Sequence, residues 1–138
     1  MLKDETIDEM SRLLWLALPD ILISRRYEYI AMDSGRMELR PIGSIHGAFV
    51  FDVSWVSGPG GGTVATLVAL LTRLKDKWVQ MHPSPDNRSL AFTAPNDRVE
   101  AVLDTGYDHE TGECLLFVAP DIDDNPDECY ELRLVLPQ

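Results

Sequence analysis

Basic residues and cysteines are scarce in this chain of 138 residues. It has 12 Lys and Arg against 23 Asp and Glu, which gives a formal net charge of −11. Direct binding to nucleic-acid phosphates is therefore not expected, because such binding needs a basic face. Cys114 and Cys129 are too few for a disulfide framework, so we expect a reduced, intracellular protein with half-buried thiols rather than a single bridge.

Long apolar runs are missing as well. No stretch approaches the roughly 20 apolar residues that a membrane-spanning helix needs. Residues 1–5 are polar and acidic, unlike the start of a secretory signal. The hydrophobic content of 45% and the charged content of 25% are ordinary for a soluble globular protein. We expect one domain with one core, spanning residues 1–138.

The negative charge is concentrated in the C-terminal part. Residues 1–80 carry nine Lys and Arg against ten Asp and Glu, whereas residues 81–138 carry three Arg against thirteen Asp and Glu, a net −10. A solvated acidic surface is the simplest interpretation. Two sharper interpretations are a surface that repels passing DNA and a surface that mimics DNA toward a basic partner.

Hydrophobic periodicity predicts two helices. A capping box at Thr6–Glu9 starts the first helix, and Pro19 ends it near Leu18. The second helix is expected over residues 63–78, with one apolar face. The residues that we expect this helix to bury are Val64, Leu67, Val68, Leu71, Leu74 and Trp78.

Alternating and apolar segments predict six or seven strands. They are residues 27–32, 37–42, 45–56, 90–93, 99–104, 114–119 and 130–136. The turn Asp33–Arg36 joins the first two as a hairpin. This order predicts an α+β fold, in which two helices pack on one face of a mostly antiparallel or mixed β-sheet.

The glycine-rich segment Ser57–Gly62 precedes the second helix. Free amides at Gly61, Gly62 and Thr63 could hold a phosphate at the helix start. No Lys-Ser or Lys-Thr pair follows, as a nucleotide-binding loop would require. A flexible loop or a subunit contact is therefore expected here instead of a nucleotide site.

Three other segments resemble chemical sites but lack defining residues. Asp121–Leu132 begins like a calcium loop, yet its sixth position is Pro126 and its twelfth is Leu132. Asp108–Cys114 holds possible metal ligands in one turn, which preorganises them poorly. Ser44 and His46 would share one face of a strand, without a third group to orient them. We predict no metal, no cofactor and no catalytic residue, and hence no enzyme.

Several features taken together resemble the phage tail completion protein R family of contractile-tailed phages. The resemblance covers about residues 5 to 136. Its elements are a helix ending at Leu18-Pro19, the hairpin turn Asp33–Arg36, the alternating strand Gly47–Trp55, the glycine and proline loop, the leucine-rich helix ending near Trp78, and an acidic stretch before the strand Tyr130–Leu136. The chain departs from the family pattern in the two prolines of His82–Arg88 and in the long hairpin Asp104–Glu113.

The resemblance implies a tail terminator or tail completion protein, with two helices on a sheet. Such proteins cap the finished tail tube as a ring, a hexamer by family resemblance, and join it to the head connector. The implied partners are further copies of the chain, tail tube and sheath proteins, and head-connector or neck proteins. The implied location is the tail or neck of the virion, after assembly in the host cytoplasm. Neither a membrane nor a specific nucleic acid is implied as a partner.

We expect the partner interface to include glycines of the loop and aspartates of the acidic stretch. These residues are Gly58, Gly60, Gly61, Gly62, Asp121, Asp123 and Asp124. An alternative function, based on the charge of residues 81–138, is a small acidic inhibitor that mimics DNA and blocks a nucleic-acid enzyme.

Overall fold

The computed structural model describes residues 20–56, 62–76, 79–85, 89–108, 113–120, 124 and 127–135. A short helical turn at residues 20–22 comes first. The remaining elements are β1 (Tyr27–Met32), β2 (Arg36–Pro41), β3 (Phe49–Val56), α2 (Val64–Leu74), β4 (Gln80–Pro83), β5 (Ser89–Thr93), β6 (Val99–Asp108), β7 (Glu113–Ala119) and β8 (Cys129–Leu134). No helix in these ranges is both long and apolar enough to span a membrane.

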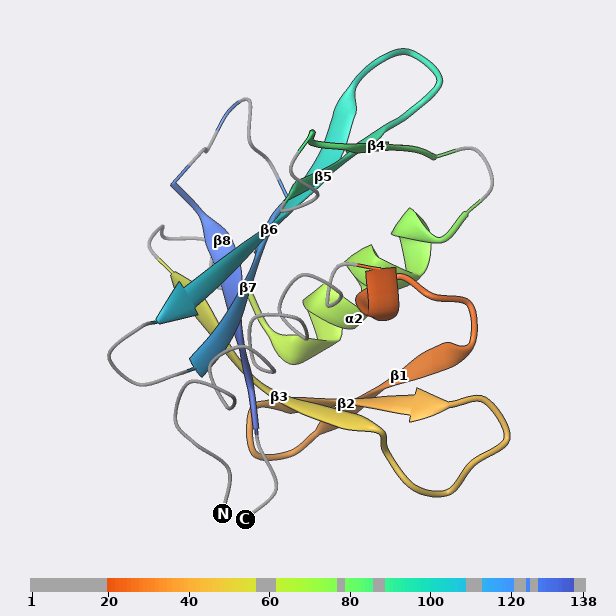
Figure 1. Ribbon diagram of the computed structural model, residues 1–138, viewed down its shortest axis with the longest axis vertical. Coiled ribbons are helices and arrows are strands. Elements are labelled where there is room, and N and C mark those ends of the chain that lie inside the picture. The colour runs from red at the N-terminus through yellow and green to blue at the C-terminus, as the bar shows by residue number, and fades with distance from the viewer. Residues whose placement is uncertain are drawn as a thin grey trace.

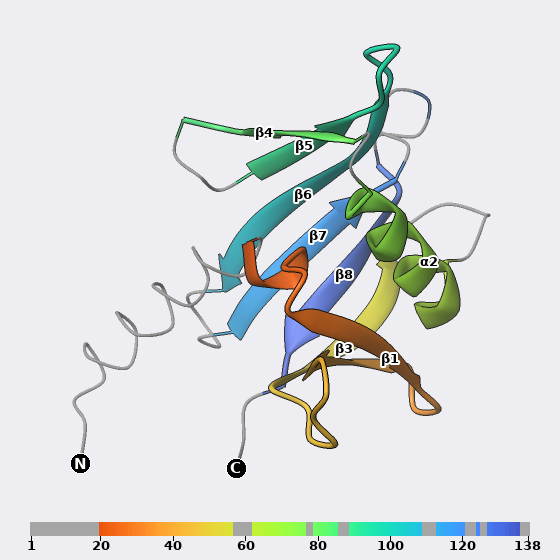
Figure 2. The ribbon, with the colours of Figure 1, turned by 90° about the vertical axis from the view of Figure 1, so that its right-hand side faces the viewer.

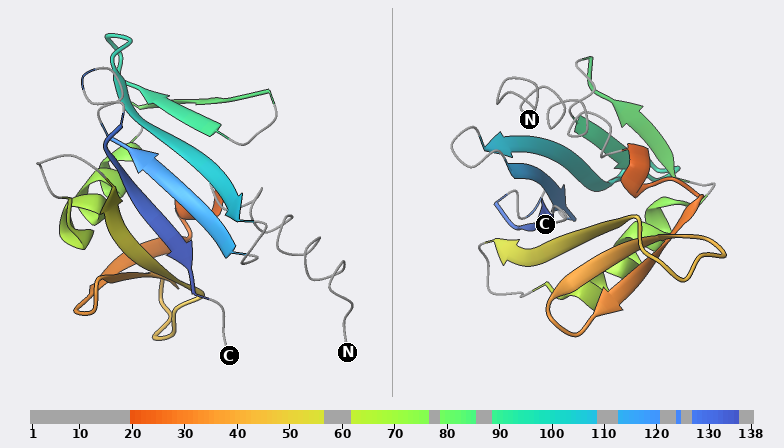
Figure 3. Two further views of the ribbon diagram at one scale, coloured as in Figure 1. Left: turned by 90° about the vertical axis from the view of Figure 1, so that its left-hand side faces the viewer. Right: turned by 60° about the horizontal axis from the view of Figure 1, so that its bottom comes forward.

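The eight strands form one sheet in the order β1-β2-β3-β8-β7-β6-β5-β4 (Figure 1). Every neighbouring pair is antiparallel. The sheet is strongly curved, and its two ends, β1–β2 and β4–β5, bend toward the same side (Figures 2 and 3). α2 and residues 20–22 lie on this concave side, between the two ends of the sheet.

The expected fold class, α+β with two helices on one face of a sheet, is wrong. The described residues form mostly one eight-stranded antiparallel sheet with little helix. The first expected helix, near residues 6–18, lies outside the described residues. The second is shorter than expected, because α2 ends at Leu74 with Lys75 as its C-cap. The sheet also has one strand more than predicted, because no strand was expected over Gln80–Pro83, which forms β4.

Strand alternation places one row of side chains in the core. In β2, Met37 and Leu39 are buried, and in β8 the buried residues are Tyr130, Leu132 and Leu134. The inward side chains of β3 include Phe51, whereas its neighbour Asp52 is exposed. The buried residues follow the period of two that puts alternate residues of a strand on opposite faces.

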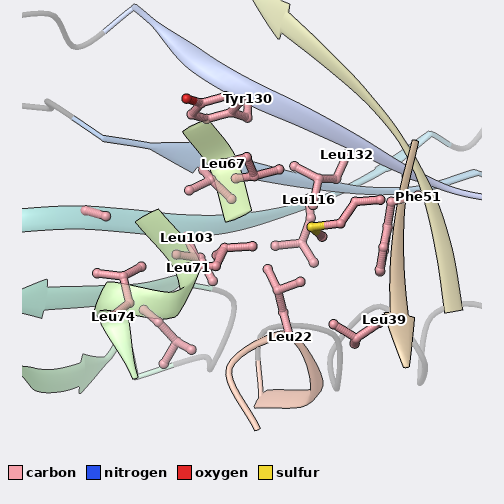
Figure 4. Packing of buried hydrophobic residues seen from close by; sticks show 14 of the residues in the cluster. Leu22, Leu39, Phe51, Leu67, Leu71, Leu74, Leu103, Leu116, Tyr130 and Leu132 are labelled. Atoms are coloured by element: carbon pink, nitrogen blue, oxygen red, sulfur yellow. The ribbon is translucent and has the colours of Figure 1, made fainter. Parts of the chain in front are cut away.

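α2 contributes the helical half of the core. Leu67, Leu71 and Leu74 are buried at helical spacing and point toward the sheet side chains around Leu103, Leu116 and Leu132 (Figure 4). Leu22, from the short helical turn, fills the same space from the other side. One connected apolar cluster therefore joins α2, residues 20–22 and strands from both ends of the sheet.

The hairpin between β1 and β2 shows why the chain turns where it does. Met32 pairs with Arg36, which leaves a loop of three residues, and Gly35 has φ +74. A three-residue hairpin loop commonly ends in a left-handed residue, which glycine adopts without steric cost. The hairpin predicted at Asp33–Arg36 is confirmed.

Two boundaries differ from the sequence-based prediction. The strand expected at 45–56 begins at Phe49, because Ser44 closes a turn with His46 in the preceding loop. No strand was predicted between residues 78 and 90, but Met81 and His82 pair with Phe92 and Ala91. Short exposed strands such as β4 carry little hydrophobic pattern, so they are hard to distinguish from loops.

We predict that Leu71→Ala lowers the free energy of unfolding by about 2–5 kcal/mol, because it leaves a cavity between α2 and the sheet. The matched variant Val68→Ala should cost less, because Val68 is only half-buried on the same helix. Urea unfolding followed by circular dichroism measures both values. Equal losses of unfolding free energy in the two variants would contradict the greater burial of Leu71 on α2.

Candidate functional site

Most of the residues expected at a partner interface lie outside the described part of the chain. Gly58, Gly60, Gly61, Asp121 and Asp123 belong to this group. Asp124 is described and is exposed. Gly62 is half-buried at the end of the glycine-rich segment, immediately before the N-cap of α2. The structure therefore locates two of the seven residues and does not bring the set together.

Gly62 lies against an aromatic pair. The rings of Trp55 and Tyr130 meet edge to face with centroids 4.9 Å apart. A Cβ on Gly62 would lie 2.4 Å from Cε3 of Trp55 and 2.5 Å from Cε1 of Tyr130. Only a glycine fits here without a shift of the rings, so at this position the glycine has a packing role.

The start of α2 satisfies its own amides. The Thr66 amide donates to Oγ1 of Thr63 at 3.2 Å, and the Thr63 amide donates to Oγ1 of Thr66 at 2.9 Å. Oγ1 of Thr66 also lies 2.6 Å from the Tyr130 hydroxyl of β8. The Thr63 amide, which the sequence offered as part of a phosphate cradle, is thus already used in a reciprocal cap.

We predict that Gly62→Ala costs about 1–3 kcal/mol of stability through overpacking. It should also change the near-ultraviolet circular dichroism of the Trp55–Tyr130 pair. Gly43→Ala is the control, because its φ of +87 gives backbone strain in open space without ring contact. An unchanged aromatic signal in Gly62→Ala would show that the glycine is not packed as described.

The other chemical motifs do not converge. Ser44 and His46 lie in a loop rather than on a strand, and Oγ of Ser44 bonds only the backbone of His46. His82 Nε2 lies 2.9 Å from Oγ1 of Thr93 on the neighbouring strand. Among the described residues there is no cluster of three or more metal-ligating side chains. Residues 109–112 of the expected turn and residues 121–123 of the acidic stretch lie outside the described part of the chain.

Cys129 is a free, half-buried thiol on β8. Burial, together with the negative charge of Glu131, raises the pKa of this thiol. A raised pKa leaves less thiolate near neutral pH, which makes the side chain a poor nucleophile. Cys129 therefore behaves as a small packed residue.

A contact between the end of α2 and the chain that enters β1 is not indicated by any sequence pattern. Nη2 of Arg25 donates to the carbonyl of Lys75 at 3.1 Å. Nζ of Lys75 donates to the carbonyl of Tyr27 at 2.9 Å and lies 4.1 Å from the centroid of the Tyr29 ring. We call Arg25, Tyr27, Tyr29 and Lys75 the clasp. It links the C-terminal end of α2 to β1 across about 50 residues of sequence, a separation that no local pattern reveals.

The clasp is partly shielded from water. Burial lowers the pKa of Lys75 and raises the pKa of Tyr29 well above its usual range. The Tyr29 hydroxyl donates to the carbonyl of Leu22 at 2.5 Å. Tyr29 therefore stays neutral and donates this hydrogen bond. The Lys75 ammonium has lost part of its hydration shell, which disfavours its charged form.

Two hollows open on either side of the clasp. One has a volume of about 330 Å³, and the apolar residues that line it include Leu74, Met81 and Phe92. The second has a volume of about 420 Å³ and is lined by Arg25, Tyr27, Glu28, Tyr29, Ile42, Thr72 and Lys75. We call the second one the Lys75 hollow. Arg25 and Lys75 line both hollows.

The surface also carries features suited to association. β1 and β4 are the edge strands of the sheet formed by the described residues. Ile42 and Ile45, in the loop between β2 and β3, are 64% and 80% exposed. An open sheet edge can pair with another chain, and an exposed isoleucine can be buried by a partner.

We predict that Tyr29→Phe lowers the free energy of unfolding by about 1 kcal/mol near neutral pH, because the Leu22 carbonyl loses its donor. The native chain should also lose stability as the pH rises above about 10, because Tyr29 ionises in the unfolded chain but not in the folded chain. Tyr29→Phe should reduce this loss. Urea unfolding at several alkaline pH values measures the difference, and parallel curves for both proteins would contradict the described environment of Tyr29.

Comparisons with known proteins gave no match: no protein-family model, no curated protein and no solved structure matches this chain.

Proposed function

We propose that this chain is a structural virion protein, a tail terminator or tail completion protein that caps a phage tail tube. In this role, copies of the chain form a ring that joins the tube to the head connector. Its partners are other copies of itself, tail tube and sheath proteins, and neck proteins. The proposal assigns no reaction to the chain and no cofactor.

The uneven charge of the chain carries this proposal. Residues 81–138 hold a net −10, and four of their described carboxylates, Asp97, Asp104, Asp124 and Asp127, are exposed. A surface of this kind repels DNA at short range, as the wall of a DNA passage must. The proposal does not rest on the two-helix fold implied by the resemblance, because the structure contradicts that fold.

Two further features support an assembly role. Within the described residues, the edge strands β1 and β4 pair on one side only, which leaves a side on which a neighbouring chain can add. The exposed Ile42 and Ile45 form an apolar tip that a partner can cover. In a ring, each subunit contacts its two neighbours through two different surfaces. Edge strands and an exposed loop at different places on the subunit can serve as these two surfaces.

The test is the position of the protein on tail tubes. Phage tail tubes are mixed with the gold-labelled chain and examined by electron microscopy. We predict label at one end of the tube and a closed ring by mass photometry of the end complex. Label along the whole tube, or none on tubes, would contradict the proposal.

Ile45→Asp should weaken end binding at least tenfold while leaving the fold intact, because this side chain is 80% exposed. Asn96→Asp is the matched control, since it adds the same charge in an exposed turn and keeps an oxygen for the Arg98 amide. Equal binding of both variants would exclude the isoleucine loop from the interface.

The same charge favours one other function, a DNA mimic that blocks a nucleic-acid enzyme. That function requires tight, salt-sensitive binding to a basic protein. Reversal of charge at Asp121, Asp123 and Asp124 should abolish such binding. Inhibition that survives this reversal would exclude the mimic.

A further inference from the structure

The basic residues of this chain are few, and half of the eight in the described ranges form an ion pair with a carboxylate. Four ion pairs account for Arg36, Arg40, Arg73 and Arg133. Within the described ranges, no carboxylate forms an ion pair with Arg25 or Lys75. These two cations lie together, joined by the bond from Arg25 to the Lys75 carbonyl.

Both cations line the Lys75 hollow, and the structure fixes each of them there. One N–H of the Lys75 ammonium is used on the Tyr27 carbonyl, and the group lies over the Tyr29 ring. A lysine ammonium has three donors, so donors remain for a further acceptor. Burial of this ammonium lowers its pKa, which shows that its neighbours do not fully replace the water it has lost.

The walls of the Lys75 hollow define the size and nature of a suitable ligand. Tyr27, Tyr29 and Ile42 supply aromatic and apolar surface, and the volume of about 420 Å³ lies within the range of small-molecule sites. Glu28 also lines the hollow and is exposed. Two cations and one carboxylate leave one positive charge, which matches a monoanion better than a phosphate dianion.

We infer that the Lys75 hollow binds a small carboxylate with a compact aromatic or branched apolar body. The carboxylate accepts from the Lys75 ammonium and the Arg25 guanidinium, and the apolar body packs against Tyr27, Tyr29 and Ile42. This binding is a function beyond the proposed assembly role and does not depend on it. No bond is made or broken in the bound molecule.

The test uses the purified full-length chain, with phenylacetate as the probe and neutral phenylacetamide as its isostere. Two-dimensional NMR of the nitrogen-labelled chain should show saturable shifts at residues 25–29 and 75 with phenylacetate. Phenylacetamide should bind at least tenfold more weakly, because it lacks the charge that Arg25 and Lys75 would neutralise.

Arg25→Gln and Lys75→Met should each weaken phenylacetate binding at least tenfold. Arg98→Gln is the control and should bind as the native chain does, because Arg98 is an exposed cation away from the hollow. Arg25 is exposed, so Arg25→Gln decides the outcome if Lys75→Met fails to fold. Absence of saturable shifts, equal binding of the amide, or unchanged binding by folded Arg25→Gln would overturn the inference.

Discussion

The burial of the α2 leucines in the concave face of the sheet is the contact on which the other features depend. An isolated helix of 11 residues is marginal in water, so α2 needs the sheet to remain helical. The curved sheet, in turn, has an apolar inner face that only α2 and residues 20–22 cover within the described residues. Leu67 and Leu71 therefore belong to one apolar cluster that connects strands near both ends of the sheet.

The clasp is a consequence of this closure. Because α2 ends beside β1, its last residues meet the chain entering that strand, and Lys75 reaches the Tyr27 carbonyl. The helix end presents free carbonyls, and Arg25 satisfies the one at Lys75. Two cations are thereby held close together in a chain of strongly negative net charge. The packing of the α2 end against β1 thus also forms the Lys75 hollow, for which we infer a ligand.

Sequence patterns predicted the parts of the fold that depend on local chemistry. The alternation of β3 and β8, the turn at Gly35 and the buried face of α2 each follow from residue spacing within one element. The fold class was wrong because the described residues form mostly one antiparallel sheet with little helix. β4 was not predicted as a strand because its four residues are exposed and lack a hydrophobic period. The clasp could not be predicted, since Arg25 and Lys75 meet only after the sheet curves. Of the expected interface, the structure describes Gly62 and Asp124, and it gives Gly62 a packing role.

Native-state hydrogen exchange tests most directly whether α2 and the sheet are one cooperative unit. The amides of Leu71 in α2 and Leu132 in β8 should exchange with the same free energy of opening, equal to that of global unfolding, because neither element keeps its core without the other. Exchange of the α2 amides at a much lower free energy, while β8 stays protected, would show that the sheet is stable by itself. The helix would then be an accessory to the fold rather than its centre.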